Sequence, residues 1–150
     1  MANRPRRLPI YGSKFWNPVY FVTYNVLDRV SILANDAVHT EFKEFASVAY
    51  TEYGISVGEY VIMPDHVHLF VRGNLTFHLG KWVGLLKRAM SRGINQDLPH
   101  WQEGLFDHIL RNWESYSLKC EYVRMNPVRA GLVKNPEDWP YQGAIVDLSF

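Results

Sequence analysis

ISVGEYVIMPDHVHLFVR, at residues 55–72, predicts a β-hairpin in the middle of the chain. Residues 55–63 are rich in β-branched and aromatic side chains, which favour a strand. Pro64 and Asp65 suit a tight turn, and residues 66–72 supply a second strand that returns beside the first. This hairpin indicates an antiparallel sheet into which the rest of the chain must fit.

The residues before the hairpin predict a strand followed by a helix. Residues 19–26 read VYFVTYNV, which again favours a strand. Asn35 or Asp36 can cap a helix in which apolar side chains recur at helical spacing until Gly54 ends it.

The second half predicts a helix over residues 79–92 that ends at Gly93, a strand over residues 104–111, and a helix from its cap Asn112 to about Asn126. The complete order, β-α-β-β-α-β-α, is that of a split βαβ unit. The sequence therefore predicts an α+β fold of the ferredoxin-like type. Its antiparallel sheet has helices on one face, and the other face is free for a functional site.

Length and composition fit a single domain. A chain of 150 residues, of which 47% are hydrophobic and 21% charged, can bury a core of its own and is not of a disordered type. We expect one domain over residues 1–150, with a basic N-terminal arm at residues 1–18 and a C-terminal tail at residues 141–150.

The sequence also indicates the cellular compartment in which the protein is expected. No apolar run approaches the roughly 20 residues that cross a bilayer, and the N-terminus lacks the apolar stretch of a secretion signal. Cys120 is the only cysteine, which excludes an intramolecular disulfide and fits a reducing environment. We therefore expect a cytoplasmic protein with no membrane contact.

Charge is unevenly distributed, although the net charge is only +1. The N-terminal arm carries Arg4, Arg6 and Arg7 with no acidic residue, and basic residues outnumber acidic ones from Arg72 to Lys134. Such stretches can follow the phosphates of a nucleic acid, and they also occur as ordinary solvated surface.

His66 and His68 are the first candidate site. Side chains alternate along a strand, so both imidazoles point to one face, with Cβ atoms about 6.5 to 7 Å apart. That separation lets both reach one metal ion and leaves coordination positions open for a substrate, as a catalytic metal requires. The alternative is a pair of polar side chains on a half-exposed face of the sheet.

Tyr122 and Asn126 are the second candidate. They lie four residues apart in the last predicted helix and therefore share a face near its end. A tyrosine hydroxyl can attack a phosphodiester covalently, and an amide oxygen can bind a hard cation. The alternatives are a core tyrosine, spaced from Leu118 and Met125 as such residues are, and an asparagine that caps a short turn before Pro127.

Four stretches of the chain match a known family in the right order. They are YVIMPDHVHLFV (60–71), LKRAMSRGIN (86–95), WQEGLFDHILRN (101–112) and EYVRMNPVRAGLVKNPEDWP (121–140). Together they resemble the REP-associated tyrosine transposases, relatives of the single-tyrosine HUH transposases of small insertion sequences. The resemblance covers the chain from about residue 21 to residue 140.

The resemblance implies a ferredoxin-like HUH domain that cuts and rejoins single-stranded DNA through a 5′-phosphotyrosine intermediate. The implied DNA partner contains hairpins formed by palindromic repeats. Position by position, His66 and His68 match the two histidines of the HUH motif. Tyr122 matches the nucleophile, and Asn126 falls at the third metal ligand. The implied cofactor is a divalent ion, Mg²⁺ or Mn²⁺.

Other residues become candidates for DNA contacts once this family is considered. His108 is either a further site residue or a half-buried strand histidine, whereas His39, His78 and His100 have no partner at ligand spacing and are expected at the surface. Candidate phosphate contacts are Arg4, Arg6, Arg7, Lys87, Arg88, Arg92 and Arg124. Unpaired bases can stack on tryptophans, and we expect contacts from at most one or two of Trp16, Trp82, Trp101, Trp113 and Trp139.

The chain departs from the family pattern at two places. Asp65 stands where relatives commonly have asparagine, and both residues suit the turn. Residues 139–144, WPYQGA, replace the usual Tyr-Pro-Trp-Ser-Ser string, so a DNA contact at this point is not carried over.

Two other functions fit the same residues. One is a domesticated, non-catalytic module that binds hairpin DNA or RNA, although such a module needs no complete catalytic set. The other is a metal-assisted phosphodiesterase that activates water in place of tyrosine. A monomer and a homodimer both remain open, and the short connection between Arg111 and Glu114 favours a tyrosine that acts within its own chain.

Overall fold

The computed structural model describes residues 17–150, so Arg4, Arg6, Arg7 and Trp16 lie outside the described residues. The chain forms β1 (Val19–Asn25), η1 (Leu27–Arg29), α1 (Asp36–Tyr53), β2 (Ser56–Ile62), β3 (His66–Arg72), α2 (Leu79–Ser91), β4 (Phe106–Leu110), α3 (Trp113–Arg124), α4 (Asn126–Arg129), η2 (Pro136–Asp138) and β5 (Gln142–Ala144). The predicted order of strands and helices is confirmed as far as α3. The short elements η1, α4, η2 and β5 are additional.

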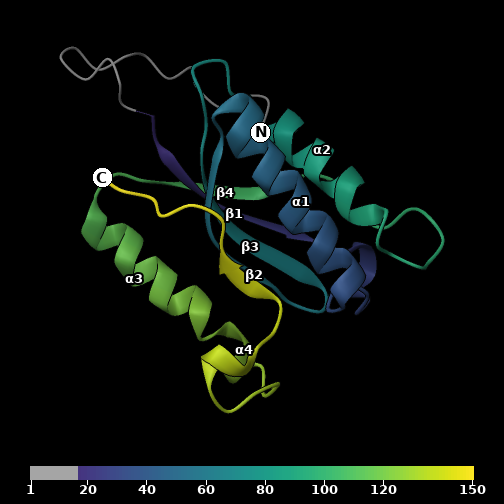
Figure 1. The fold of residues 1–150 in the computed structure, drawn as a ribbon. Coiled ribbons are helices and arrows are strands. Elements are labelled where there is room, and N and C mark those ends of the chain that lie inside the picture. Colours follow the sequence, from purple (N-terminus) through teal and green to yellow (C-terminus); the bar gives the residue numbers. More distant parts are fainter. Residues whose placement is uncertain (1–16) are drawn as a thin grey trace.

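The strands form one antiparallel sheet in the order β4-β1-β3-β2-β5. Helices α1 and α2 lie side by side on one face of this sheet, and α3 lies on the other face (Figure 1). The predicted α+β, split-βαβ architecture is confirmed. One difference is that α3 covers part of the face that we expected to be free, because its apolar side is buried there.

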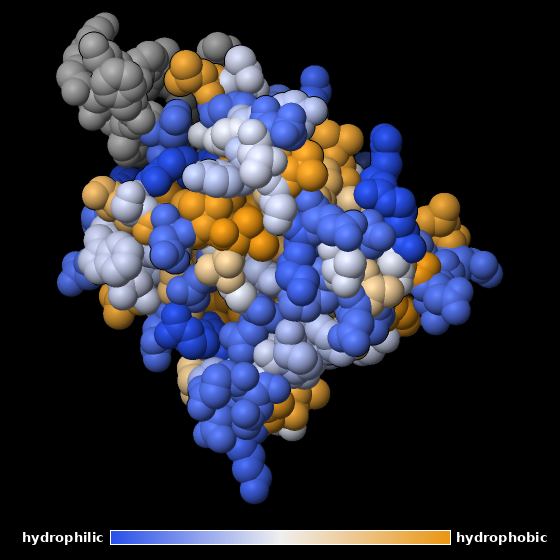
Figure 2. Space-filling model, viewed as in Figure 1, coloured by the Kyte–Doolittle hydropathy of each residue, from blue (hydrophilic) through white to orange (hydrophobic). Residues whose placement is uncertain are grey.

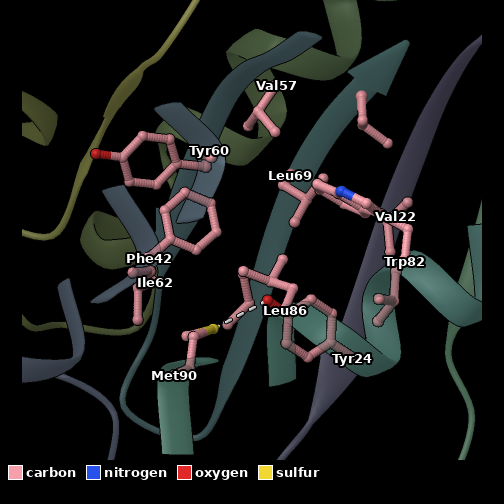
Figure 3. Close-up of a cluster of buried hydrophobic side chains, with 14 of the residues drawn as sticks. Val22, Tyr24, Phe42, Val57, Tyr60, Ile62, Leu69, Trp82, Leu86 and Met90 are labelled. Carbon is pink, nitrogen blue, oxygen red and sulfur yellow. Dashed lines mark hydrogen bonds between the residues drawn. The ribbon is translucent and has the colours of Figure 1, made fainter. Parts of the chain in front are cut away.

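Two clusters of buried side chains hold these layers together. In the larger cluster, Phe42 of α1 and Leu86 of α2 pack against Leu69 of the sheet (Figure 3). Tyr24 Oη donates a hydrogen bond of 3.1 Å to Met90 Sδ in the same cluster. The smaller cluster lies between the other face and α3, and it contains Val61, Phe70, Tyr116, Cys120 and Val123.

Local sequence explains where α1 begins and how it meets α2. The Asn35 side chain accepts a hydrogen bond from the Val38 backbone N–H at 3.0 Å, and Gly54 ends the helix in the left-handed conformation at φ 67°. Gly93 follows α2 at a point where a Cβ atom would lie 2.7 Å from the Ala37 backbone. The glycine therefore allows the end of α2 to approach the start of α1 closely.

The last ten residues, predicted only as a tail, extend the sheet and pack against the start of α3. Strand β5 pairs with β2. Leu148 is buried against Gly58, and a Cβ atom at position 58 would lie only 2.6 Å from Leu148 Cδ1. The Trp139 indole donates a hydrogen bond of 2.9 Å to the carbonyl oxygen of Ile62, which fixes the chain just before this segment.

Three histidines away from the His66–His68 pair differ in their surroundings. His78 is exposed, as expected, and caps α2. His39 is half-buried and shares a hydrogen bond of 2.7 Å with Tyr60 Oη. The expectation for His100 is wrong, because it is only 4% exposed and both of its ring nitrogens are hydrogen-bonded inside the protein.

The outer side of the α1–α2 pair carries an apolar groove. Figure 2 shows hydrophobic residues exposed between the two helices at the top of the view, and the residues that line the groove include Val48, Tyr53 and Leu85. No helix within residues 17–150 is long and apolar enough to span a membrane.

Candidate active site

His66 and His68 project from β3 on one face of the sheet, as predicted from the strand periodicity. Their ring centroids lie 4.8 Å apart with the planes at 81°. Across the ladder, Thr23 of β1 lies opposite His68 and Asn25 lies opposite His66. The pair therefore sits at the middle of the sheet and not at an edge.

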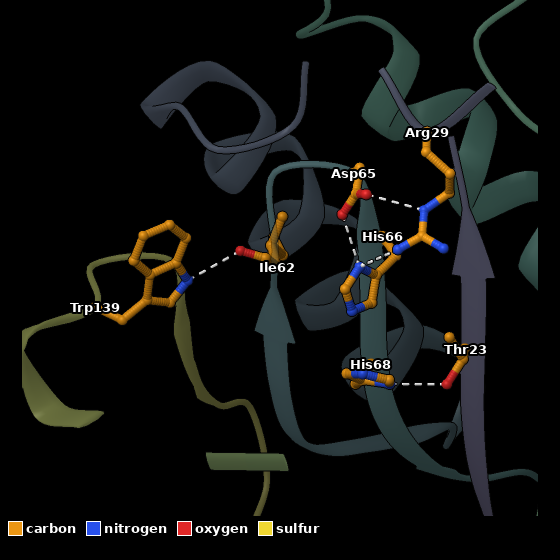
Figure 4. A network of polar contacts seen from close by, with 7 residues as sticks. All are labelled: Thr23, Arg29, Ile62, Asp65, His66, His68 and Trp139. Carbon is orange, nitrogen blue, oxygen red and sulfur yellow. Dashed lines mark hydrogen bonds and ion pairs between the residues drawn. The ribbon is translucent and has the colours of Figure 1, made fainter. Parts of the chain in front are cut away.

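A carboxylate and a guanidinium hold the outer nitrogen of His66. Asp65 Oδ1 lies 2.8 Å from His66 Nδ1, and Arg29 Nε donates to Asp65 Oδ2 at 2.9 Å (Figure 4). Burial opposes ionisation of Asp65, but the hydrogen bonds and charges of His66 and Arg29 outweigh it and lower the pKa of this carboxyl. The other ring nitrogen of His66, Nε2, points toward the ring of His68 (Figure 4).

Arg29 reaches this position from a strained turn. Asp28 and Arg29 have φ values of 57° and 55°, in the left-handed region that residues with a side chain rarely adopt. The turn is tied to the hairpin because the Val26 N–H donates to the Asp65 carbonyl oxygen at 2.9 Å. Such strain persists only where the surrounding contacts fix it, and here it places a guanidinium beside the site.

His68 is held by two residues of β1. Its Nδ1 shares a hydrogen bond of 2.7 Å with Thr23 Oγ1, and the Phe21 ring stacks on it at 5.4 Å between centroids. Burial lowers the pKa of His68 to about 3, and electrostatic interactions with His66 and with the cations Lys119, Arg129 and Arg29 act in the same direction. The imidazole is therefore neutral near pH 7, which is the form that binds metal ions.

The two histidines fit a metal site on chemical grounds. Each Nδ1 already has a partner in the protein, so each Nε2 is left for a ligand bond, as in many metal-binding histidines. Within residues 17–150 no group of three or more histidine, cysteine or acidic side chains could hold a metal ion. A third ligand from this part of the chain would therefore be of another type, such as an amide oxygen.

Tyr122 lies on the solvent side of α3. It is 58% exposed, so the alternative of a core tyrosine is wrong, whereas Tyr116, two turns earlier, is buried. Two cations lie on its ring: Arg129 Cζ is 3.9 Å and Lys119 Nζ is 5.4 Å from the ring centroid. Arg129 Nη2 also donates a hydrogen bond of 2.7 Å to the Tyr122 carbonyl oxygen.

Lys119 connects the tyrosine to the histidine pair. Its Nζ lies 5.2 Å from the centroid of the Phe21 ring, which in turn stacks on His68. The structure thus brings Tyr122 and His68 into one neighbourhood although they come from different layers. Sequence patterns do not indicate this connection, because Phe21, His68 and Lys119 are far apart along the chain.

Asn126 is the first residue of α4 and is half-buried. Its carbonyl oxygen accepts a hydrogen bond of 3.0 Å from the Ala130 N–H, so a short helical turn starts here. The capping alternative is wrong in detail, because the N-cap residue is Met125 and no side chain caps the turn. The side chain forms no hydrogen bond with His66 or His68. Its role as a metal ligand stays a prediction.

Three of the predicted DNA-binding side chains have partners inside the protein. Lys87 Nζ donates to the carbonyl oxygens of Gln102 and Gly104, Arg92 pairs with Glu41, and Arg124 pairs with Glu59 and Glu121. Arg88 lines the groove between α1 and α2, on the face of the sheet opposite the histidines. Contacts of these residues with DNA stay predictions.

The sequence did not single out Phe106, which borders the histidine pair. Thr23 lies opposite His68 on one side and opposite Phe106 on the other, so these three side chains share a row on one face. Phe106 is 72% exposed, which is unusual for a phenylalanine in a strand. His108, two residues on, is exposed on the same face.

Among the described tryptophans, only Trp113 is largely exposed. It is 58% exposed at the start of α3, whereas Trp82 and Trp139 are buried and Trp101 is half-buried with its indole N–H bonded to Lys87 O and Ser91 Oγ. Trp113 is therefore the described tryptophan most open to an unpaired base, and contacts of the tryptophans with DNA stay predictions.

Comparison with known proteins places the chain among transposases. A predicted REP-associated tyrosine transposase of Haemophilus influenzae is 23% identical over 137 residues, covering 82% of this chain and 77% of the relative. The REP-associated tyrosine transposase of Escherichia coli K12 is 27% identical over 88 residues, covering 57% of this chain and 52% of the relative.

Solved structures share the fold at low sequence identity. A REP-associated tyrosine transposase bound to a REP hairpin aligns with 98% of this chain and 95% of its own, with a TM-score of 0.70 and 20% identity. A predicted transposase from Deinococcus radiodurans aligns with 72% of this chain and 89% of its own, with a TM-score of 0.50 and 18% identity.

The family match covers most of the chain. Residues 14–118 match the family described as transposase IS200 like, a stretch that contains His66 and His68 and ends before Tyr122 and Asn126. The chain therefore belongs to the family of IS200-like transposases.

Proposed function

We propose that this chain cuts and rejoins single-stranded DNA next to hairpins formed by palindromic repeats, through a covalent link between Tyr122 and a 5′-phosphate. Membership of the transposase family supports DNA processing. The relatives named as REP-associated tyrosine transposases, one of them bound to a REP hairpin, support the choice of DNA. The observation that carries the proposal is an exposed tyrosine with two cations on its ring, one of which also lies on the ring stacked on His68.

The proposed reaction exchanges one phosphate ester for another. The phenol oxygen of Tyr122 attacks phosphorus and forms an O–P bond, while the bond from phosphorus to the 3′-oxygen breaks. The proton lost by the phenol is balanced by the proton that the 3′-oxygen gains, which leaves a free 3′-hydroxyl. A 3′-hydroxyl from another strand reverses the step, so joining needs no nucleotide triphosphate.

We further propose that His66, His68 and Asn126 bind Mg²⁺ or Mn²⁺. Such an ion supplies positive charge that polarises the scissile phosphate. The chain prepares this site itself: Thr23 and Asp65 occupy the two Nδ1 atoms, and the low pKa of His68 keeps its imidazole neutral.

The test is a denaturing gel with labelled hairpin oligonucleotides that carry unpaired flanks, taken from repeats near the gene, in Mg²⁺, Mn²⁺ or EDTA. Wild type is expected to give a metal-dependent protein–DNA adduct that is absent in Tyr122→Phe and His68→Ala. Matched controls are Tyr53→Phe, at a similarly exposed tyrosine of α1, and His78→Asn, which keeps a capping side chain at the start of α2; both should retain the adduct.

Two results would overturn the proposal in different ways. Cleavage that persists in Tyr122→Phe would refute the covalent step and favour activation of water. Binding of the hairpin by wild type with neither cleavage nor adduct in any metal would favour the non-catalytic binding module.

We also propose that Tyr122 acts within its own chain. Tyr116, Cys120 and Val123 of α3 are buried against the sheet that carries the histidines, so nucleophile and candidate ligands belong to one subunit. Mixing His68→Ala with Tyr122→Phe tests this directly. No cleavage by the mixture is expected, whereas restored cleavage would show that a partner subunit supplies the tyrosine.

A further inference from the structure

Lys119 and Arg129 differ from the other basic residues near the site. Arg29 and Arg124 each form an ion pair with an aspartate or glutamate at 2.9 to 3.2 Å. Neither Lys119 nor Arg129 pairs with a carboxylate among residues 17–150. Two cations that share one small region without a counter-charge form a site for an anion.

Both cations lie where the proposed reaction takes place. Arg129 Cζ and Lys119 Nζ are 3.9 and 5.4 Å from the centroid of the Tyr122 ring. Lys119 also lies 5.2 Å from the Phe21 ring, which stacks on His68. An anion held by both cations would therefore lie between the tyrosine of α3 and the histidine of β3.

The backbone explains why the two side chains meet. Lys119 precedes Tyr122 by three residues, so the two share a face of α3. Met125 ends α3, and the chain then turns into α4, whose last residue is Arg129. This turn brings the guanidinium back to the end of α3, where Arg129 Nη2 donates to the Tyr122 carbonyl oxygen.

We propose that Lys119 and Arg129 bind the DNA phosphate that Tyr122 attacks, so that the chain itself holds the scissile linkage before any metal ion is added. This inference rests on the proposed function and identifies residues that bind the DNA substrate of that reaction. Lysine and arginine donate charge-assisted hydrogen bonds to phosphate oxygens, and arginine can donate two at once. The hydrogen bond from Arg129 to the Tyr122 carbonyl uses only one of its donors.

The competing explanation is a purely structural one. Arg129 caps the end of α3, and both cations make favourable contacts with aromatic rings whether or not DNA is bound. A loss of activity on mutation would therefore not separate the two explanations. The test must detect whether the cations respond to the charge of one phosphate.

The test measures binding of hairpin oligonucleotides in EDTA, with the full chain carrying Tyr122→Phe so that no cleavage occurs. Each linkage of the unpaired flank is replaced in turn by an uncharged methylphosphonate. In the Tyr122→Phe protein, removing the charge of one particular linkage is expected to weaken binding by about tenfold, which is the effect of losing a charge-assisted hydrogen bond. Adding Lys119→Gln or Arg129→Gln should abolish most of that difference at the same linkage.

Further variants separate phosphate binding from folding. Lys119→Arg and Arg129→Lys keep the charge and should keep the sensitivity to the methylphosphonate. The thermal midpoint of Arg129→Gln should change little, because Arg129 is exposed and forms no ion pair with a carboxylate of residues 17–150. Lys43→Gln, on α1 across the sheet, should show the same sensitivity to the methylphosphonate as the protein that carries Tyr122→Phe alone.

The binding experiment tests the phosphate contacts of Lys119 and Arg129 separately from the covalent mechanism. If no linkage is charge-sensitive in the Tyr122→Phe background, or if the sensitive linkage stays equally sensitive in both glutamine variants, Lys119 and Arg129 do not hold a phosphate. The covalent mechanism could still stand, because the gel assay tests it separately. Conversely, the charge-sensitive contact can be present even where wild type cuts no DNA.

Discussion

Asp65 Oδ1 lies 2.8 Å from His66 Nδ1, and this contact decides which nitrogen of the imidazole faces the site. A carboxylate at Nδ1 favours the tautomer with the proton there, because it accepts that N–H, and leaves the lone pair on Nε2. Arg29 fixes the carboxylate from the other side at 2.9 Å. The geometry of His66 is therefore set by a residue of the hairpin turn and by a strained turn elsewhere in the chain.

Asp65→Asn is expected to weaken binding of Mn²⁺ by about tenfold, because an amide supports the imidazole less strongly than a carboxylate does. The measurement is a calorimetric titration of the metal-free full chain with Mn²⁺. Asp147→Asn, at an exposed position near the C-terminus, is the matched control. Equal affinities of wild type and Asp65→Asn would show that the carboxylate does not support the ligand.

Phe106→Ala is expected to weaken binding of a hairpin with an unpaired flank by about 1 to 3 kcal/mol, the usual contribution of one base stacked on an aromatic ring. Phe106→Tyr keeps the ring and should retain the affinity. Leu75→Ala removes another highly exposed apolar side chain and serves as the control. Fluorescence anisotropy of labelled DNA is suitable, and an unchanged affinity in Phe106→Ala would exclude a base at this position.

Trp139→Phe is expected to lower the free energy of unfolding by about 2 kcal/mol. The change removes the indole N–H that bonds to the Ile62 carbonyl oxygen, leaving a buried acceptor without its donor and a gap beside β2. Urea unfolding followed by circular dichroism measures the effect. Trp113→Phe, at an exposed tryptophan, should change the value by much less.

His39 should make the protein less stable as the pH falls. Burial lowers its pKa below the usual 6.5, Lys43 lowers it further, and Asp36 partly opposes this. His39 therefore binds a proton more readily in the unfolded chain than in the folded one. Its contribution to the free energy of unfolding is fully present above about pH 6.5 and is lost as the pH falls toward the pKa of the folded state. The free energy of unfolding is measured with urea at about pH 7 and pH 5. It should fall less between these pH values for His39→Gln than for wild type, and an equal fall in both proteins would contradict this assignment.

The sheet and its main helices could be predicted because local chemistry decides them. β-Branched and aromatic runs gave three strands, Asn35 and Gly54 bounded α1, and Asn112 capped α3. Strand β5 could not be found in this way, since three residues with a central glycine show no alternation. It forms only because its backbone pairs with β2.

The site was predictable only in part. His66 and His68 share a face because strand periodicity requires it. The exposure of Tyr122 could not be predicted, because its spacing from Leu118 also suits a core tyrosine and only the structure shows that Leu118 is itself exposed. The contact of Arg29 with Asp65 depends on two left-handed residues that are not glycine, which no local pattern indicates. The ion pair of Arg124 with Glu59 likewise depends on how α3 packs on β2.

Helix α3 is held at both of its ends. Near its start, Tyr116 packs against Leu148 and Phe150 of the C-terminal segment, and at its end Arg124 pairs with Glu59 of β2 at 3.1 Å. A tyrosine on such a helix has little freedom to travel. If it becomes joined to a DNA end, the exchange of partners must come from movement of the nucleic acid, with the free 3′-end leaving and a new one arriving at a stationary protein-bound phosphate.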